Sequence, residues 1–199
     1  MHPNSCFRWN DRAAMRALVE EVGLGMLFAA TPEGPRVAQL PVVWDGDTLL
    51  FHLARGNALT PHLDGARALF TVTGPHAYVS PDWYGLDANQ VPTWNYLAVE
   101  LEGAVERLDR EGLVAQLDSL AAAQETRLAP KPAWTRDKMD APAFEALLRG
   151  ITGFAMTIRA WRGTAKLGQN KPAAARVAAA DAMAAAGRPA IAECMRRVS

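Results

Sequence analysis

The chain has 199 residues, half of them hydrophobic and about a fifth charged. This composition supplies enough apolar material for a buried core and excludes general disorder of the chain. The 21 Lys and Arg residues balance the 21 Asp and Glu residues, so the chain lacks the basic excess typical of a dedicated nucleic-acid binder.

In the first half of the chain, one helix is expected to precede a series of strands. Apolar residues recur at helical spacing behind the capping residue Asp11, which predicts a helix over about residues 11–22. The Asp-Gly-Asp sequence at 45–47 is typical of a hairpin turn. Pro41 removes a backbone donor and indicates a sheet edge or a bulge. The expected strands cover residues 36–44, 48–54, 66–73 and 77–80, with a helical turn at 57–65 and a long structured loop over 74–92.

The second half alternates strands with helices. Apolar and polar residues alternate with a period of two over residues 97–106, which predicts a strand with one solvated face. Asp109 is expected to cap a helix that continues to about Ala123. The chain then continues with an irregular segment at 129–135, a helix at 141–149, a strand at 153–161 and alanine-rich helices at 173–186 and 191–197.

Because the strands occur in hairpins, and the helices lie between or after them, this order predicts an antiparallel α+β fold, in which a barrel would remove exposed sheet edges. We expect a single domain over residues 1–199, with a helical extension over about 171–199. No apolar run is long enough to span a bilayer, and the first ten residues contain no apolar signal core. Two cysteines near opposite ends favour reduced thiols. We therefore expect a cytoplasmic protein without membrane contact.

Several classes of site lack their sequence signal. The four histidines show no metal-ligand spacing, and neither a Rossmann nor a P-loop glycine motif is present. The serines match no nucleophile motif. We therefore predict no metal site and assign no catalytic residue.

The segment Phe51–Asn57, at the end of an expected strand, is a candidate phosphate site. Arg55 is a fixed cation whose planar group suits a phosphate. Gly56 and Asn57 tolerate unusual backbone angles and offer N–H groups to an anion. The alternative is that Arg55 forms an ordinary salt bridge at the surface.

The segment Gly74–Tyr84 places aromatic and polar side chains between glycine and prolines. Such a segment is stiff and presents flat apolar faces with polar tips, which suits a planar ring or a subunit interface. The alternative is an apolar plug that closes one end of the barrel. The side chains concerned are His76, Tyr78, Ser80, Trp83 and Tyr84.

Two further segments, Val91–Tyr96 and Gly163–Asn170, carry polar side chains beside aromatic ones. The second follows an expected strand and precedes a helix. Lys166 supplies a cation, and Gln169 supplies amide donors and acceptors. The alternative for this segment is a helix-capping turn with a solvated lysine.

Together, in order and spacing, these segments resemble the PaiB-type family of FMN-binding negative transcriptional regulators, over about residues 1–197. The resemblance implies an antiparallel split β-barrel with peripheral helices and a helical C-terminal tail, similar to pyridoxamine-phosphate oxidase and flavin reductases. It also implies a homodimer with FMN in clefts between the subunits. The cofactor-binding residues implied by the matching motifs are His52, Arg55, Asn57, Ser80, Trp94, Lys166 and Gln169. The chain departs from the expected Lys-Leu-Ser-Gln-Asn motif at Gly168, which stands in place of the serine.

Three functions follow as hypotheses. The first is an FMN-binding protein, with flavin-dependent oxidoreductase activity as an extension, in which the flavin supplies the redox chemistry. The second is a regulator that acts through DNA or protein contacts without flavin chemistry, although the chain shows no clear helix-turn-helix and direct DNA binding is not predicted. The third is a haem-binding split barrel in which His52 or His76 is the axial ligand.

Overall fold

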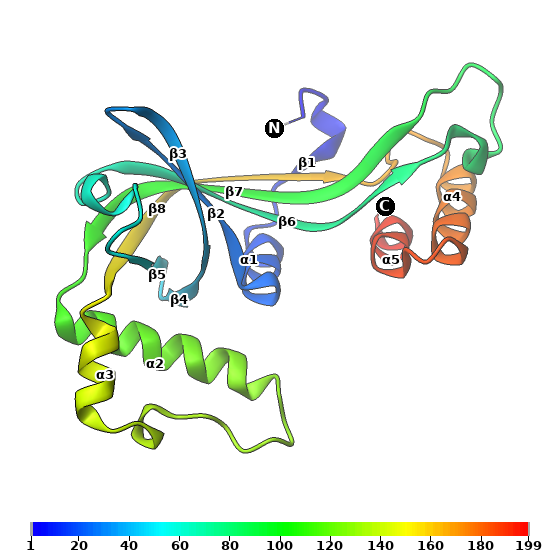
Figure 1. The fold of residues 1–199 in the computed structure, drawn as a ribbon. Helices are drawn as coiled ribbons and strands as arrows, with labels where there is room; N and C mark the ends of the chain where they lie inside the picture. Colours follow the sequence, from blue (N-terminus) through cyan, green and yellow to red (C-terminus); the bar gives the residue numbers. More distant parts are fainter. Residues whose placement is uncertain (1, 199) are drawn as a thin grey trace. The chain divides into compact units, whose positions relative to one another are not determined.

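The computed structural model describes residues 2–198 (Figure 1). Its strands are β1 (Arg8–Trp9), β2 (Leu24–Thr31), β3 (Gly34–Pro41), β4 (Val43–Asp45), β5 (Thr48–Ala54), β6 (Arg67–Val79), β7 (Thr93–Arg107) and β8 (Ile151–Lys166). Its α-helices are α1 (Arg12–Val22), α2 (Arg110–Thr126), α3 (Ala141–Leu148), α4 (Ala173–Ala185) and α5 (Pro189–Arg197). Short 3-10 helices cover Ser5–Phe7, Thr60–His62, Pro81–Tyr84 and Arg136–Lys138.

The strands form one sheet in the order β3-β2-β6-β7-β8-β5-β4, and β1 pairs with β8. The pairs β2–β3, β2–β6, β4–β5 and β5–β8 are all antiparallel. Helices follow or interrupt the strands without forming crossovers between parallel neighbours. The predicted antiparallel α+β fold is therefore confirmed.

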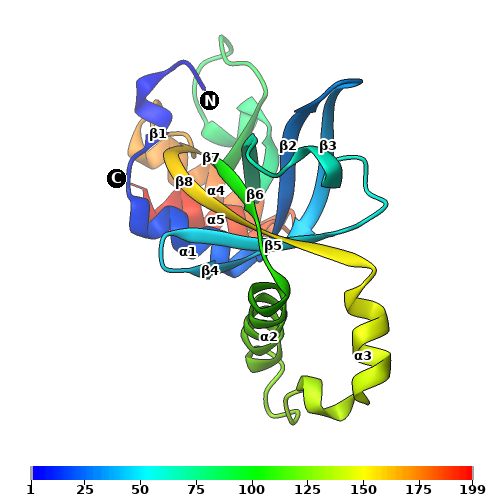
Figure 2. The ribbon, with the colours of Figure 1, turned by 90° about the vertical axis from the view of Figure 1, so that its left-hand side faces the viewer.

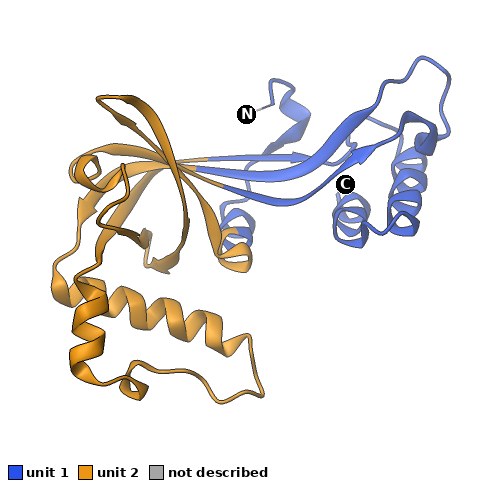
Figure 3. Cartoon of the chain, in the orientation of Figure 1, with its two compact units in different colours: residues 1–18, 72–100, 162–199 blue, residues 19–71, 101–161 orange. Residues whose placement is uncertain are grey.

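The chain divides into two compact units (Figure 3). Unit 1 comprises residues 1–18, 72–100 and 162–199, and unit 2 comprises residues 19–71 and 101–161. The strands β6, β7 and β8 each contribute residues to both units. Whether the chain behaves as the single domain predicted from its length stays a prediction.

The neighbouring strands β7, β8 and β5 form the centre of unit 2. Phe51 of β5 lies opposite Phe154 of β8, and the two buried rings stack with centroids 5.7 Å apart. Gly103 of β7 permits a close approach, because a Cβ at this position would lie only 2.4 Å from the carbonyl oxygen of Thr157. Figure 2 shows how α2 follows the end of β7 and how α3 leads into β8.

Unit 1 contains the C-terminal helices α4 and α5, which pack against each other (Figure 1). The buried side chains of these two helices are small or flexible and apolar. They include Ala179, Ala180, Met183, Ile191, Ala192 and Met195. The alanine-rich tail therefore forms a packed helical pair, as the sequence predicts.

Several predicted elements are confirmed. The first helix is α1, the helix capped by Asp109 is α2, and the alternating strand at 97–106 is the central part of β7. Pro41 ends β3, which lies at one edge of the sheet, as predicted. Among the described residues, no helix combines the length and the apolar character needed to cross a membrane.

Two expectations about the strands are wrong. The segment 36–44 is divided, because β3 pairs with β2 whereas β4 pairs with β5. The long loop does not begin at Gly74, since β6 continues through Gly74 and Pro75 to Val79. Packing favours a glycine at this position, because a Cβ there would lie 2.9 Å from a terminal methyl of Leu18 and 3.2 Å from the Cβ of Leu97. Gly74 and Pro75, where the loop was expected to begin, therefore lie within a strand.

Candidate functional site

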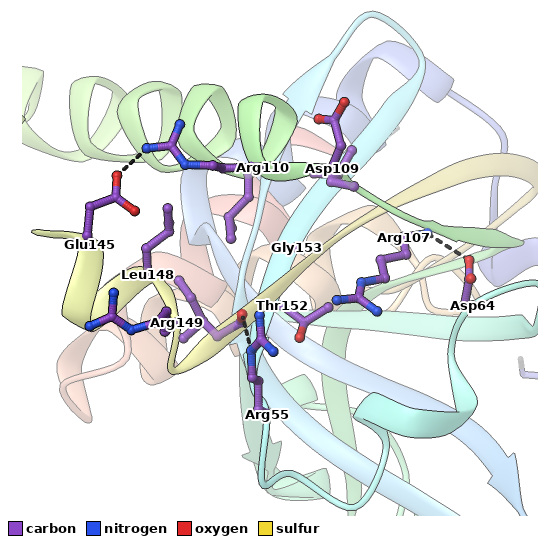
Figure 4. A pocket seen from close by; sticks show the side chains of 13 residues that line it. Arg55, Asp64, Arg107, Asp109, Arg110, Glu145, Leu148, Arg149, Thr152 and Gly153 are labelled. Carbon is purple, nitrogen blue, oxygen red and sulfur yellow. Dashed lines mark hydrogen bonds and ion pairs between the residues drawn. The ribbon is translucent and has the colours of Figure 1, made fainter.

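A basic cavity of about 610 Å³ lies in unit 2, where β5 and β7 end and β8 begins (Figure 4). Its volume falls within the range of small-molecule sites. Four arginines line it from separate segments: Arg55 follows β5, Arg107 ends β7, Arg110 begins α2 and Arg149 follows α3. The cavity therefore collects cations that are far apart in the sequence.

The acidic residues of this cavity neutralise only part of that charge. Glu145 of α3 forms an ion pair with Arg110. Asp64 accepts a hydrogen bond from the backbone N–H of Arg107 at 2.9 Å. Asp109 caps α2 by accepting from the N–H of Gly112 at 2.8 Å. Among the described residues, no carboxylate forms an ion pair with the guanidinium groups of Arg55, Arg107 and Arg149.

Arg55 is held at the edge of the cavity by the neighbouring strand. Its backbone N–H donates to the carbonyl oxygen of Gly150 at 2.9 Å, and its side-chain Nε donates to that of Ile151 at 3.3 Å. These bonds leave the two terminal nitrogens of the guanidinium group for a ligand. In Figure 4 the Arg55 side chain lies next to Thr152 and points towards the part of the cavity that Arg107 also lines. An anion with several oxygens can accept from such a set of donors.

The rest of the Phe51–Asn57 segment does not line this cavity. The side-chain oxygen of Asn57 accepts from the N–H of Leu59 at 2.9 Å, so Asn57 closes the turn after β5. Neither Gly56 nor Asn57 adopts a positive φ. The tolerance of these two residues for a positive φ is therefore not used here, and ordinary turn hydrogen bonds hold the turn.

His52 lies on the face of β5 that α2 covers. Its Nδ1 is 3.2 Å from the side-chain oxygen of Gln116, a residue of α2 with no exposed surface. Burial lowers the pKa of His52, and the hydrogen bond to Gln116 opposes this shift. His52 is therefore neutral near pH 7, and it does not line the basic cavity.

The other predicted cofactor-binding residues belong to unit 1. Lys166 ends β8, and its ammonium group donates to the hydroxyl of Thr93 and lies 5.9 Å from the centre of the Phe7 ring. Burial lowers the pKa of Lys166. Both ends of the Gln169 amide are engaged within its own loop, since the amide nitrogen donates to the carbonyl oxygen of Ala165 at 2.6 Å and the amide oxygen accepts from the N–H of Leu167 at 2.8 Å. Lys166 therefore offers a cation, whereas Gln169 shapes the loop.

Gly168 has a φ of +85°, in the left-handed region that favours glycine. The departure from the expected Lys-Leu-Ser-Gln-Asn motif thus coincides with a backbone conformation in which a side chain is strained. Its carbonyl oxygen accepts from the N–H of Lys171 at 2.9 Å, which closes the turn before α4.

Trp94 and Tyr78 form an exposed aromatic surface in unit 1. Trp94 is 53% exposed and Tyr78 49% exposed, and their rings meet edge to face with centroids 6.5 Å apart. The ring of His76 lies 6.1 Å from that of Trp94. Ser80 follows β6 and precedes the 3-10 helix Pro81–Tyr84, and its side chain caps no N–H there. This surface, rather than a closed plug, is what the Gly74–Tyr84 segment and Trp94 present.

Of the seven predicted residues, the basic cavity therefore contains only Arg55. Arg107 and Arg149 were missed, although a usable signal exists: Arg107 directly follows the strand expected at 97–106, and Arg149 is the last residue of the helix expected at 141–149. The sequence does not indicate that the end of this strand and the end of this helix line the same cavity as Arg55.

Comparisons with known proteins agree with the fold and the resemblance. Residues 1–160 match the family described as "Putative FMN-binding domain". The chain is 29% identical to the Bacillus subtilis (strain 168) protein "Protease synthase and sporulation protein PAI 2" over 158 residues, which cover 77% of this chain and 74% of that protein.

Solved structures show the same fold at low identity. The FAD and heme binding protein from Mycobacterium smegmatis has a TM-score of 0.60 and 20% identity, with 81% of this chain and 74% of that chain covered. The flavocytochrome Anf3 from Azotobacter vinelandii has a TM-score of 0.61 and 17% identity, with 84% and 73% covered. The predicted α+β split barrel with a helical C-terminal tail is confirmed, and the chain belongs to the "Putative FMN-binding domain" family.

Proposed function

We propose that this protein binds FMN and that the basic cavity of unit 2 holds its phosphate group. The observation that carries the proposal is the set of guanidinium groups of Arg55, Arg107 and Arg149, which have no ion pair among the described residues. A phosphate monoester carries close to two negative charges at neutral pH and accepts several charge-assisted hydrogen bonds. Arginine is suited to this task because its planar group can donate two parallel hydrogen bonds.

Bound FMN would supply redox chemistry to a small substrate, while the residues of this chain would bind and orient it. We propose that Ser80, Trp94 and Lys166 contribute to flavin binding as the family resemblance implies, and that Gln169 contributes by shaping the loop after Lys166. The exposed rings of Trp94 and Tyr78 offer flat apolar surface of the kind that a flavin ring or a second subunit covers. We also propose that the protein is a cytoplasmic homodimer, for which light scattering should give twice the chain mass.

The phosphate is tested by comparing FMN with riboflavin, which lacks it. We expect wild-type protein to quench the fluorescence of FMN with clearly higher affinity than that of riboflavin. Arg55→Ala and Arg149→Ala should each weaken FMN binding about tenfold or more, since a hydrogen bond to a charged group contributes about 1.5–3 kcal/mol. Their affinity for riboflavin should not change.

Arg159→Ala is the matched control, because Arg159 is exposed on β8 and lines none of the cavities described for this chain. It should bind FMN like the wild type. Equal affinity for FMN and riboflavin in the wild-type protein would refute the phosphate assignment. So would arginine variants that fold normally and still bind FMN fully.

One observation favours haem as a second candidate cofactor. The Nδ1 of His76 lies 3.0 Å from the carbonyl oxygen of Gly74. Because a carbonyl only accepts, Nδ1 carries the proton, which leaves the Nε2 lone pair for a metal, an arrangement common among metal-ligating histidines. Haem titration of His76→Ala and wild-type protein tests this candidate: a Soret band that depends on His76 would support it.

A further inference from the structure

A second hollow lies in unit 2, within the arch formed by α2, the segment 127–140 and α3 (Figure 2). We call α2, the segment 127–140 and α3 together, residues 110–148, the helical arch. Within it, no side chain from residue 117 to residue 147 is buried. The segment nevertheless carries several large apolar side chains. An arch of this size would normally bury some of them against its own interior.

These side chains line one cavity of about 370 Å³. Its wall is almost entirely apolar, and aromatic rings contribute two of its sides. The large apolar side chains of the arch that line it are Leu117, Leu120, Trp134, Met139, Phe144 and Leu147, and Ala121, Leu148 and Ile151 complete the apolar lining. An adjoining hollow shares Ala121, Trp134 and Phe144 with the first, together with Asp118, Arg136 and Met139. The volume and the lining are those of a small-molecule site rather than of a packing gap.

The arch is held open by hydrogen bonds of the connecting segment. The backbone N–H of Trp134 donates to the Glu125 carboxylate at 2.8 Å, and the ammonium group of Lys138 donates to the carbonyl oxygen of Ala133 at 2.7 Å. Arg136 lies over the ring of Phe144, 5.2 Å from its centre. Trp134 and Phe144 are thus positioned before any ligand arrives, which lowers the entropic cost of binding.

The charges at this cavity indicate the kind of ligand. Its charged lining residues are Asp118, Glu125 and Arg136. Arg136 makes two hydrogen bonds to the Asp118 carboxylate, at 3.0 and 3.1 Å, and Glu125 forms an ion pair with Lys131. Because each of these charges is already paired, a charged ligand would gain no partner and would lose its hydration. An uncharged ligand would lose much less hydration energy on binding.

We propose that the helical arch is a second binding site, for a neutral, flat, largely apolar small molecule that packs between Trp134 and Phe144. The basic cavity contacts the first turn of α2 and shares the lining residues Leu148 and Ile151 with this one. Its arginines suit a phosphate, however, so the two sites differ in the chemistry that they would recognise. The site is independent of the proposed FMN binding.

Nile red, an uncharged planar dye that fluoresces in apolar surroundings, is the probe. We expect saturable binding of one dye per chain, and we expect saturating FMN not to displace it. Ala121→Trp places an indole in the cavity and should weaken dye binding about tenfold or more. Ala123→Trp is the matched control, because Ala123 is exposed on the same helix and does not line the cavity. It should bind the dye like the wild type.

Far-UV circular dichroism shows whether Ala121→Trp folds. A second measurement uses the wild-type protein: the indole N–H signal of Trp134 in NMR, assigned with Trp134→Phe, should shift as dye is added. An unchanged signal, or equal dye binding by folded Ala121→Trp, would overturn the proposal. So would light scattering in which Ala121→Trp halves the mass of the wild-type protein, because the cavity would then be a contact between subunits.

Discussion

Replacing Gly168 by alanine tests the backbone conformation of the loop that joins β8 to α4. The glycine has a φ of +85°, which L-residues adopt only at a cost of about 1–2 kcal/mol. A Cβ placed there would lie 3.5 Å from the Tyr84 hydroxyl and 3.6 Å from the Cγ of Arg176, which are ordinary contact distances. The expected loss is therefore conformational, with no added clash.

We expect Gly168→Ala to lower the free energy of unfolding by about 1–2 kcal/mol, and Gly168→Ser to have an effect of similar size. For a chain of this length, 1 kcal/mol corresponds to about 2–4 °C in the melting temperature. Urea denaturation and thermal melts followed by circular dichroism measure both quantities.

The sign of the change distinguishes this explanation from its alternative. At a glycine with an ordinary negative φ, alanine stabilises a protein by about 0.4–1 kcal/mol, because it restricts the unfolded chain. Gly56 provides that comparison, since it has no positive φ and a Cβ there would meet nothing within 4 Å. A Gly168→Ala variant as stable as the wild type, or more stable, would refute the conformation described here.

Two further predictions concern α2 and the residue it covers. Burial lowers the pKa of His52, so the unfolded chain binds a proton at this residue more readily than the folded chain does. The free energy of unfolding should therefore decrease as the pH falls below about 6.5, the ordinary pKa of histidine. His52→Gln should therefore flatten the dependence of unfolding free energy on pH between about 7 and 5, as measured by urea denaturation at several pH values; identical slopes would contradict the burial of His52. Asp109→Ala removes the cap that accepts from Gly112 and should cost about 1 kcal/mol, whereas Asp109→Asn should retain most of the stability. If all three proteins melt together, the cap contributes nothing.

Local signals in the sequence were sufficient for most of the elements. A capping aspartate, a two-residue turn and a run with a period of two act on backbone geometry within a few residues, so α2, the β4–β5 hairpin and β7 could be predicted. The same reasoning was wrong at Gly74-Pro75. There the preference for glycine comes from close packing against Leu18 and Leu97, which are distant in sequence, rather than from a turn.

The candidate site was predicted only in part, because a side chain's chemical type does not reveal what else it contacts. Arg55 could be recognised as a candidate anion ligand from its residue type alone. Gln169 and Asn57 have equally suitable amides, but in the tertiary structure the oxygen of each amide, and the nitrogen of the Gln169 amide, already bond to neighbouring backbone groups.

The sequence by itself thus determined the helices, most strands, the family resemblance and one arginine of the basic cavity. Only the tertiary structure showed that three further arginines line the same cavity as this one. The antiparallel register that pairs Ala54 with Ile151 places Arg55 beside the segment that follows Arg149, and the end of β7 adds Arg107. Strand pairing over nearly a hundred positions depends on the whole sheet, whereas a helix cap or a tight turn depends on its own few residues.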